Sequence, residues 1–234
     1  MKYISALSSP VFDRPGPRAL SILGSTGSIG TSALKVVAKN PGALRVVALA
    51  GARNMALLAR QAEAFRPAVL GVLDEAKARE LRELLPAGYA PTILAGQEGY
   101  TALATLPEAD LVLAAQVGAA GLVPALAAAR AGKVLCLANK EALVLAGDLF
   151  RRACAESGAV ILPVDSEHNA LFQAFAGHDG RQATRLILTA SGGPFRTWPA
   201  EKIRAVTPAQ ALKHPNWSMG AKISIDSATM MNKG

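Results

Sequence analysis

The sequence predicts an α/β protein: a doubly wound, Rossmann-like parallel sheet followed by the start of an α+β domain. Short apolar runs alternate with longer amphipathic runs as far as Val164, which is typical of successive βαβ units. A glycine-rich turn at residues 24–30 separates the first apolar run from the first amphipathic one. From Gly177 onward Gly, Pro, Trp and His become frequent and the βα rhythm weakens.

The apolar runs predict seven strands, which are residues 19–23, 44–50, 68–73, 91–94, 111–115, 134–138 and 160–164. The amphipathic runs predict helices at residues 28–39, 55–65, 75–85, 121–131 and 141–157. Asn54 and Asp74 have side chains that can cap the second and third of these helices. In the first helix the expected buried face is Ile29, Ala33, Val36 and Val37.

A domain boundary is expected near Asp165, which separates a dinucleotide-binding domain at residues 19–164 from the first part of a catalytic domain at residues 165–234. Residues 1–18 include three prolines and lack the continuous apolar core of a signal peptide, so we expect a disordered extension rather than a targeting peptide. No apolar run reaches the ~20 residues that span a bilayer, and no membrane partner is expected.

The net charge of +8 comes from scattered Lys and Arg, with Arg151 and Arg152 as the only adjacent pair. Binding of a nucleic-acid partner requires a basic stripe on the protein, so this scattered distribution argues against it. A basic surface does help to attract phosphorylated substrates. Cys136 and Cys154 form no CxxC motif and lie in apolar stretches. Free thiols are therefore expected, as in a cytoplasmic enzyme.

Gly24, Gly27 and Gly30 form a GxxGxxG turn between a predicted strand and a predicted helix. Such a turn lets backbone amides approach a pyrophosphate, which favours a dinucleotide site over a purely structural turn. No Asp or Glu follows the second strand, where an NAD site would place one. Arg53 stands there instead, so NADP is favoured, the alternative being a solvated arginine.

Asp165, Ser166 and Glu167 directly follow a predicted strand, at the edge of the sheet where ligands bind in open α/β folds. The two carboxylates are suited to a hard cation such as Mg²⁺ or Mn²⁺, or else form a charge pair at a helix N-terminus. Residues 189–195 predict a strand and a Gly-Gly turn, either an anion-binding nest around Ser191 or a plain turn.

Further hydrogen-bond donors follow in Ser227, Asn232 and Lys233. His214 and His168 are candidate proton carriers or structural histidines.

Six motifs occur in order: residues 24–30 (GSTGSIG), 138–142 (ANKEA), 165–168 (DSEH), 191–195 (SGGPF), 214–220 (HPNWSMG) and 225–234 (IDSATMMNKG). Together they closely resemble the 1-deoxy-D-xylulose 5-phosphate reductoisomerase family. The resemblance implies that the sugar phosphate is rearranged at a Mg²⁺ or Mn²⁺ ion and then reduced by NADPH to 2-C-methyl-D-erythritol 4-phosphate, an isoprenoid precursor. It also implies a homodimer.

The resemblance also implies residue roles. Catalytic residues would be Lys140, Asp165, Glu167 and His214, with Asp165 and Glu167 as metal ligands. Cofactor-binding residues would be Thr26, Gly27, Ser28, Ile29, Arg53, Asn54, Asn139, Glu141 and Gly220. Substrate-binding residues would be Lys140, Ser166, Glu167, Ser191, His214, Trp217, Ser227, Asn232 and Lys233, with His214 and Trp217 on a closing flap.

The chain departs from the family pattern in two places. It has Ala52-Arg53-Asn54 where Gly-Lys-Asn is common, which keeps the positive charge. The family motif continues beyond Gly234 to a glutamate that is a third metal ligand, and then to dimer-forming strands and a helical domain. We therefore expect a C-terminally truncated chain that folds in its first part and has little turnover.

Two other interpretations remain open. One is an NADPH-binding fragment without catalysis. The other is a different NADP-dependent reductase, such as a semialdehyde dehydrogenase, which requires a catalytic cysteine on a loop or helix N-terminus. Cys136 is expected in a strand and Cys154 in a helix, which disfavours the second interpretation.

Overall fold

The computed structural model describes residues 10–176, 178, 182–215 and 220–231. The chain divides into two units, Met1–Asp165 and Ser166–Gly234. No helix in the described ranges has both the length and the apolarity needed to cross a membrane.

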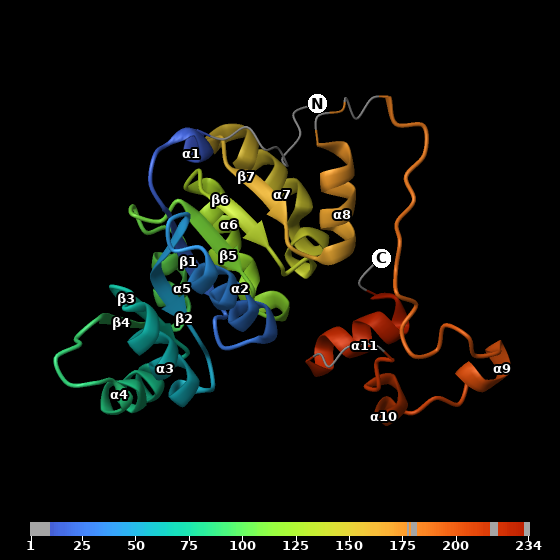
Figure 1. Cartoon of the computed structure of the whole chain (residues 1–234), viewed down its shortest axis with the longest axis horizontal. Coiled ribbons are helices and arrows are strands. Elements are labelled where there is room, and N and C mark those ends of the chain that lie inside the picture. Colours follow the sequence, from blue (N-terminus) through green and yellow to red (C-terminus); the bar gives the residue numbers. More distant parts are fainter. Residues whose placement is uncertain (1–9, 177, 179–181, 216–219, 232–234) are drawn as a thin grey trace. The chain divides into compact units, whose positions relative to one another are not determined.

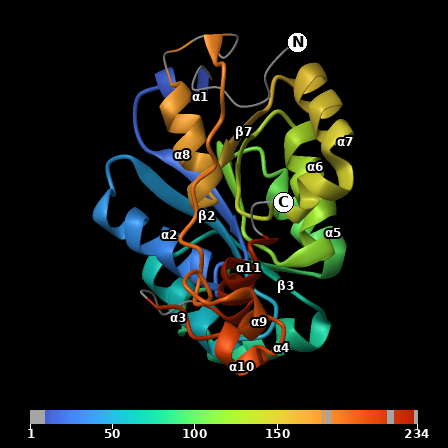
Figure 2. The same ribbon diagram turned by 90° about the vertical axis from the view of Figure 1, so that its right-hand side faces the viewer.

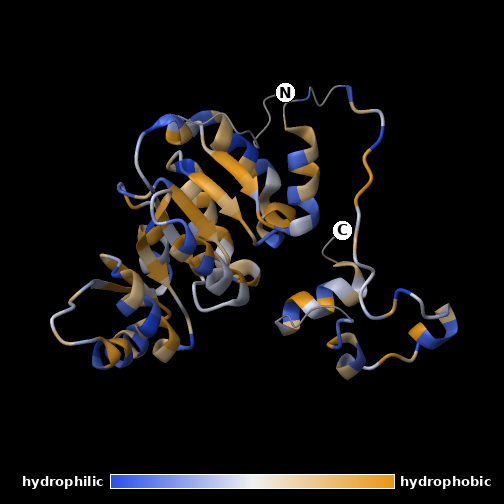
Figure 3. Cartoon of the chain, viewed as in Figure 1, coloured by the Kyte–Doolittle hydropathy of each residue, from blue (hydrophilic) through white to orange (hydrophobic). Residues whose placement is uncertain are grey.

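The first unit is built on a seven-stranded parallel sheet of order β4-β3-β2-β1-β5-β6-β7. The strands are β1 (Arg18–Leu23), β2 (Leu44–Ala50), β3 (Val69–Val72), β4 (Thr92–Ala95), β5 (Leu111–Ala114), β6 (Val134–Leu137) and β7 (Val160–Pro163). Figure 3 shows these strands among the most hydrophobic parts of the chain. The predicted doubly wound sheet is confirmed, because the strand order reverses at β1 and β5.

Helices cover both faces of this sheet (Figure 1 and Figure 2). Buried residues of α2 (Ser28–Lys39), α3 (Met55–Phe65) and α4 (Glu75–Leu84) pack in one core. Those of α5 (Gly96–Ala104), α6 (Leu122–Arg130) and α7 (Glu141–Ser157) pack in the other, and a short 3-10 helix, η1 (Gly118–Gly121), precedes α6. Asn54 and Asp74 cap α3 and α4 as predicted, accepting from the amides of Leu57 and Lys77.

Three local expectations differ from the structure. Helix α5 was not predicted, because its sequence begins with Gly96 and carries few strong apolar residues. On α2, Val36 is 52% exposed and Leu34 is buried instead. Residues 10–18 of the expected disordered extension form the helix α1 (Pro10–Asp13) and an ordered segment, while Met1–Ser9 lie outside the described residues.

Asp110 fastens this N-terminal segment to the amino edge of the sheet. Its carboxylate accepts the Ala19 amide at 2.9 Å and forms an ion pair with Arg14. Burial alone would raise the pKa of Asp110, but these hydrogen bonds and the charges of Arg14 and Arg18 outweigh burial and lower it.

Both cysteines are free thiols, as predicted. Burial raises the pKa of Cys136, in β6, to about 11, and also raises the pKa of Cys154, in α7. Neither lies on a loop or helix N-terminus, so neither is placed as a catalytic nucleophile.

The turn between β1 and α2 depends on two glycines. Gly24 has φ +91°, and a Cβ there would lie 2.6 Å from the Ala115 carbonyl oxygen at the end of β5. A Cβ on Gly30 would lie 2.4 Å from the Gly24 carbonyl oxygen. The first turn of α2 therefore packs directly on the backbone of the loop.

The second unit contains α8 (Ser166–Phe175), α9 (Ala200–Ile203), α10 (Pro208–Ala211) and α11 (Ala221–Thr229). The strand predicted from residue 189 is absent from the described part of this unit, because residues 183–193 pair with no other segment there. Gly192 and Gly193 have φ of +78° and +60°, consistent with the predicted Gly-Gly turn. Phe195, Ala211, Ser224 and Ser227 are buried.

Replacement of Gly30 by alanine is expected to lower the free energy of unfolding by about 2–3 kcal/mol, because the new methyl group meets backbone atoms that cannot rotate away. Gly147→Ala is the matched control: in α7 no atom lies within 4 Å of the place that its methyl group would take, so it should be neutral or stabilising. Urea unfolding measures both, and equal stability of the two variants would contradict the packing argument.

Asp110→Asn is expected to lower the unfolding free energy by about 1–2 kcal/mol at pH 7. The pKa of Asp110 is lowered on folding, so the carboxylate's contribution is present above its unfolded pKa of about 3.9 and is lost as the pH falls through the folded value. The difference from the parent chain should therefore vanish near pH 2–3. Asp13→Asn, at an exposed position, is the control. A difference that persisted unchanged at pH 2–3 would contradict the assignment.

Candidate cofactor and substrate sites

Most of the predicted site residues of the first unit lie at the carboxyl ends of the parallel strands. The glycine-rich turn follows β1, and β5 pairs with β1 next to it. Asn139 and Lys140 follow β6, and Asp165 follows β7 two residues after Pro163. Ligands of open α/β sheets bind at this edge, where the strand order reverses.

A buried side chain from α3 supports the glycine-rich turn. Gln61, which is 7% exposed, donates its Nε2 to the Ser25 carbonyl at 2.9 Å. Thr26 packs against Gly51, where a Cβ would lie 3.1 Å from the Thr26 methyl carbon. Gln61 was not predicted from the sequence, although a glutamine among apolar residues on a helix face is the feature that points to it.

Gly27 is the N-cap of α2, followed by Ser28 and Ile29 in the first turn of the helix. A Cβ on Gly27 would have only the Gly24 carbonyl within 4 Å, at 3.4 Å, so this glycine is not required by packing. The N-cap has no side-chain hydrogen bond. Exposed amides at a helix N-terminus with no side chain in front of them suit a pyrophosphate.

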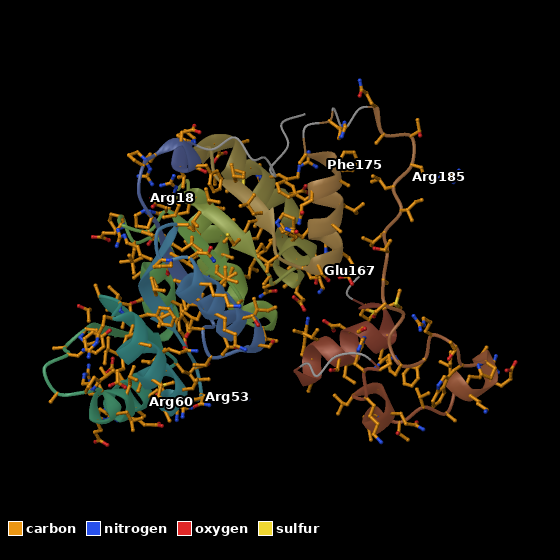
Figure 4. The ribbon with its side chains drawn as sticks, viewed as in Figure 1. Arg18, Arg53, Arg60, Glu167, Phe175 and Arg185 are labelled. Atoms are coloured by element: carbon orange, nitrogen blue, oxygen red, sulfur yellow. The ribbon has the colours of Figure 1, made fainter. Side chains whose placement is uncertain are left out.

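Arg53 and Asn54 lie between β2 and α3. The Asn54 side chain caps α3, accepting from the Leu57 amide at 2.9 Å. Arg53 is exposed (Figure 4), and the four residues that directly follow β2, residues 51–54, include no carboxylate. Tyr100 donates to the Gly51 carbonyl at 3.3 Å, and burial, with a smaller effect from Asp74, raises its pKa to about 12. Tyr100 is therefore a neutral donor that holds the end of β2.

Asn139 is 3% exposed and fixes the loop after β5. Its Nδ2 donates to the Gly118 carbonyl at 2.7 Å. Gly121 permits this arrangement, since a Cβ there would lie 2.5 Å from Asn139 Nδ2. Asn139 Oδ1 and Gln116 Oε1 are buried without a hydrogen-bond partner among the described residues. Two buried acceptors at the cofactor edge suit a ligand with amide or hydroxyl donors.

Lys140 and Asp165 form an ion pair, with Nζ 2.5 Å from Oδ2 and side chains that are 22% and 15% exposed. Asp165 therefore already has a positively charged partner, the ammonium group of Lys140. Glu141 begins α7.

In the second unit, Ser166 donates to Glu167 Oε2 at 2.9 Å in the first turn of α8, which also carries His168. Figure 4 labels Glu167 at this end of the helix. No cluster of three or more His, Cys, Asp or Glu side chains that could hold a metal occurs within the described ranges.

Three predicted substrate-binding residues come together in the second unit. Ser191 Oγ lies 3.1 Å from Ser227 Oγ and 3.3 Å from His214 Nε2. Gly193 makes this possible, because a Cβ there would lie 2.7 Å from the Ser227 carbonyl oxygen on α11. Gly220 is the N-cap of α11. The two hydroxyls and the imidazole form a small polar cluster with the chemistry of an anion site. The predicted roles of Trp217, Asn232 and Lys233 fall outside the described residues.

Family comparisons agree with these two units. Residues 20–147 match the family model for 1-deoxy-D-xylulose 5-phosphate reductoisomerase, and residues 161–234 match the one for the C-terminal domain of that enzyme. The reductoisomerase of Nitratidesulfovibrio vulgaris strain DP4 is 66% identical over all 234 residues, which span 57% of that relative. The one from Lawsonia intracellularis is 56% identical over 232 residues, 58% of its length. The chain thus spans a little more than half the length of these curated relatives.

Solved structures of the same family are also similar. The Zymomonas mobilis reductoisomerase in complex with NADPH matches with a TM-score of 0.82 at 45% identity, over 93% of this chain and 55% of that one. A reductoisomerase in complex with NADPH, fosmidomycin and magnesium matches with a TM-score of 0.83 at 43% identity, over 92% of this chain and 55% of that one. The chain belongs to the 1-deoxy-D-xylulose 5-phosphate reductoisomerase family.

Proposed function

We propose that this chain supplies the NADPH-binding and substrate-binding parts of a reductoisomerase that converts 1-deoxy-D-xylulose 5-phosphate into 2-C-methyl-D-erythritol 4-phosphate, an isoprenoid precursor. The observation that carries the proposal is the glycine-rich turn at the point where the strand order reverses, in a chain of this family. Relatives with NADPH or magnesium in their solved structures support the same cofactors here, with Mn²⁺ as an alternative metal.

Each part of the chain has a defined task in this proposal. Gly27 and the first amides of α2 bind the pyrophosphate, and Arg53 binds the 2′-phosphate. When bound, NADPH supplies a hydride and the divalent cation supplies Lewis acidity. Asp165 and Glu167 hold the cation, and Lys140 contacts the substrate oxygens. Ser191 and Ser227 hold the substrate phosphate, whose fixed charge orients the reacting carbons.

A cytoplasmic location and, for the full-length enzyme of this family, a homodimer complete the proposal. Two free thiols with no disulfide between them fit a reducing compartment. The homodimer is inferred from the family resemblance.

Calorimetric titration of the purified chain tests the proposal. NADPH should bind, and 1-deoxy-D-xylulose 5-phosphate should bind more tightly when Mg²⁺ or Mn²⁺ is present. NADPH binding without any metal-dependent substrate binding would instead support an NADPH-binding fragment. If NADPH did not bind, the proposal would fail.

Arg53→Gln is expected to weaken NADPH binding about tenfold and leave NADH binding unchanged, because only NADPH carries the 2′-phosphate. The measurement is the quenching of protein fluorescence on titration with each nucleotide. Gly27→Ala should weaken both nucleotides, since its methyl group would meet the pyrophosphate that they share. If Arg53→Gln lost affinity for NADPH and for NADH equally, the assigned role of Arg53 would be contradicted.

Lys140→Met is expected to raise the affinity for Mn²⁺ severalfold, because the ammonium group no longer competes for Asp165 Oδ2. Electron paramagnetic resonance of free Mn²⁺ measures this without turnover. Lys39→Met, which removes an exposed charge from the last turn of α2, is the control. Unchanged or weaker Mn²⁺ binding in Lys140→Met would show that the cation does not use this carboxylate.

A further inference from the structure

Helix α3 carries one exposed arginine, Arg60, six residues after its N-cap Asn54. Its neighbour Gln61 holds the Ser25 carbonyl of the glycine-rich turn at 2.9 Å. Three residues earlier, the Leu57 amide is capped by Asn54, which directly follows Arg53. Residues three apart are neighbours on a helix surface, so Arg60 lies next to Leu57, whose amide donates to the cap residue.

The side chain of Arg60 can reach the N-terminal end of α3. Six residues of helix separate it from the N-cap, about 9 Å along the axis. Long side chains in helices lean toward the N-terminus, so an extended arginine covers most of that distance. Figure 4 labels Arg53 and Arg60 in the part of the first unit that contains α3.

Both guanidinium groups are available to a ligand. Arg53 and Arg60 are exposed, and neither guanidinium takes part in a hydrogen bond or an ion pair within the part of the chain that the structure describes. By contrast, Arg14 is held by Asp110, and Arg18 donates to the carbonyls of Gly16 and Phe12. Thus, among its described residues, this unit uses arginines at its amino edge for structure, whereas Arg53 and Arg60, like Arg79 and Arg82 of α4, take part in no hydrogen bond or ion pair.

We propose that Arg60 is a specificity-determining residue that binds the 2′-phosphate of NADPH together with Arg53. A phosphate monoester has three terminal oxygens, and two guanidinium forks arriving from the β2–α3 loop and from the second turn of α3 can engage different oxygens. No carboxylate follows β2 to oppose the phosphate charge. This inference rests on the proposed NADPH site and adds to it the second cation that separates NADPH from NADH.

The test compares nucleotide binding by the chain and its Arg60→Gln variant. In the variant, NADPH affinity should fall about five- to tenfold while NADH affinity stays the same. The affinity for adenosine 2′,5′-bisphosphate should likewise fall, while the affinity for adenosine 5′-monophosphate, which lacks the 2′-phosphate, should not. Arg60→Lys should lose less NADPH affinity than Arg60→Gln, because lysine keeps the positive charge and lacks only the planar, two-pronged guanidinium group. In Arg53→Gln/Arg60→Gln, NADPH should bind no better than NADH.

Arg82→Gln is the matched control, since Arg82 is an exposed arginine in the last turn of the neighbouring helix α4. It should leave both affinities unchanged. Thermal unfolding of all variants should match the parent, because every changed side chain is exposed. Arg60→Gln with unaltered NADPH affinity, or with equal losses of NADPH and NADH, would overturn the inference while Arg53→Gln still supported the site. A parent chain that bound neither nucleotide would overturn the proposed function and the inference together.

Discussion

The contact between the backbone of Gly24 and the carbonyl of Ala115 determines how the cofactor edge of this protein is built. Strands β1 and β5 are adjacent, and the chain leaves their carboxyl ends in opposite directions across the sheet. Gly24 turns with a positive φ against the end of β5, a position at which any Cβ would collide. Gly30 then brings the first turn of α2 onto the loop. These two close approaches fix the path of the glycine-rich turn between β1 and α2.

Buried side chains from other elements hold the remaining loops at this edge. Gln61 from α3 holds the glycine-rich turn, and Asn139 after β6 holds the loop after β5. Lys140 and Asp165 connect the ends of β6 and β7. Each bond joins segments far apart in sequence, so the loops keep their shape through the packed sheet rather than through local turn chemistry. Such preorganisation reduces the ordering cost of binding.

The sequence predicted the sheet and most of its helices because parallel strands buried on both faces are continuous apolar runs with little ambiguity. It missed α5, whose start lacks a cap and whose apolar residues are few. It also predicted a strand from Thr189 on composition alone. Strand formation requires a pairing partner, and composition carries no information about whether one is present.

The residues of the candidate site were also predicted only in part. Gly27 and Asp165 could be proposed from the spacing of their motifs and Lys140 from the family resemblance, and their roles stay predictions. Gln61 and Gln116 were not identified, because a single polar residue among apolar ones indicates a buried contact without showing which distant segment it meets. The residue types alone predicted Ser191 and Ser227 as hydrogen-bond donors and His214 as a proton carrier, and the family resemblance placed all three at the substrate. Their convergence requires the left-handed backbone at Gly193.

The thiols of Cys136 and Cys154 allow the order of local unfolding to be followed by chemical labelling. Thiolate is the form that alkylating reagents attack, and burial raises the pKa of Cys136 to about 11 and also raises the pKa of Cys154. Cys136 lies inside the sheet beside β5 and β7, while Cys154 lies on a helix packed over one face. Their relative labelling rates under mild alkaline conditions would therefore report whether the outer helix detaches before the strands separate.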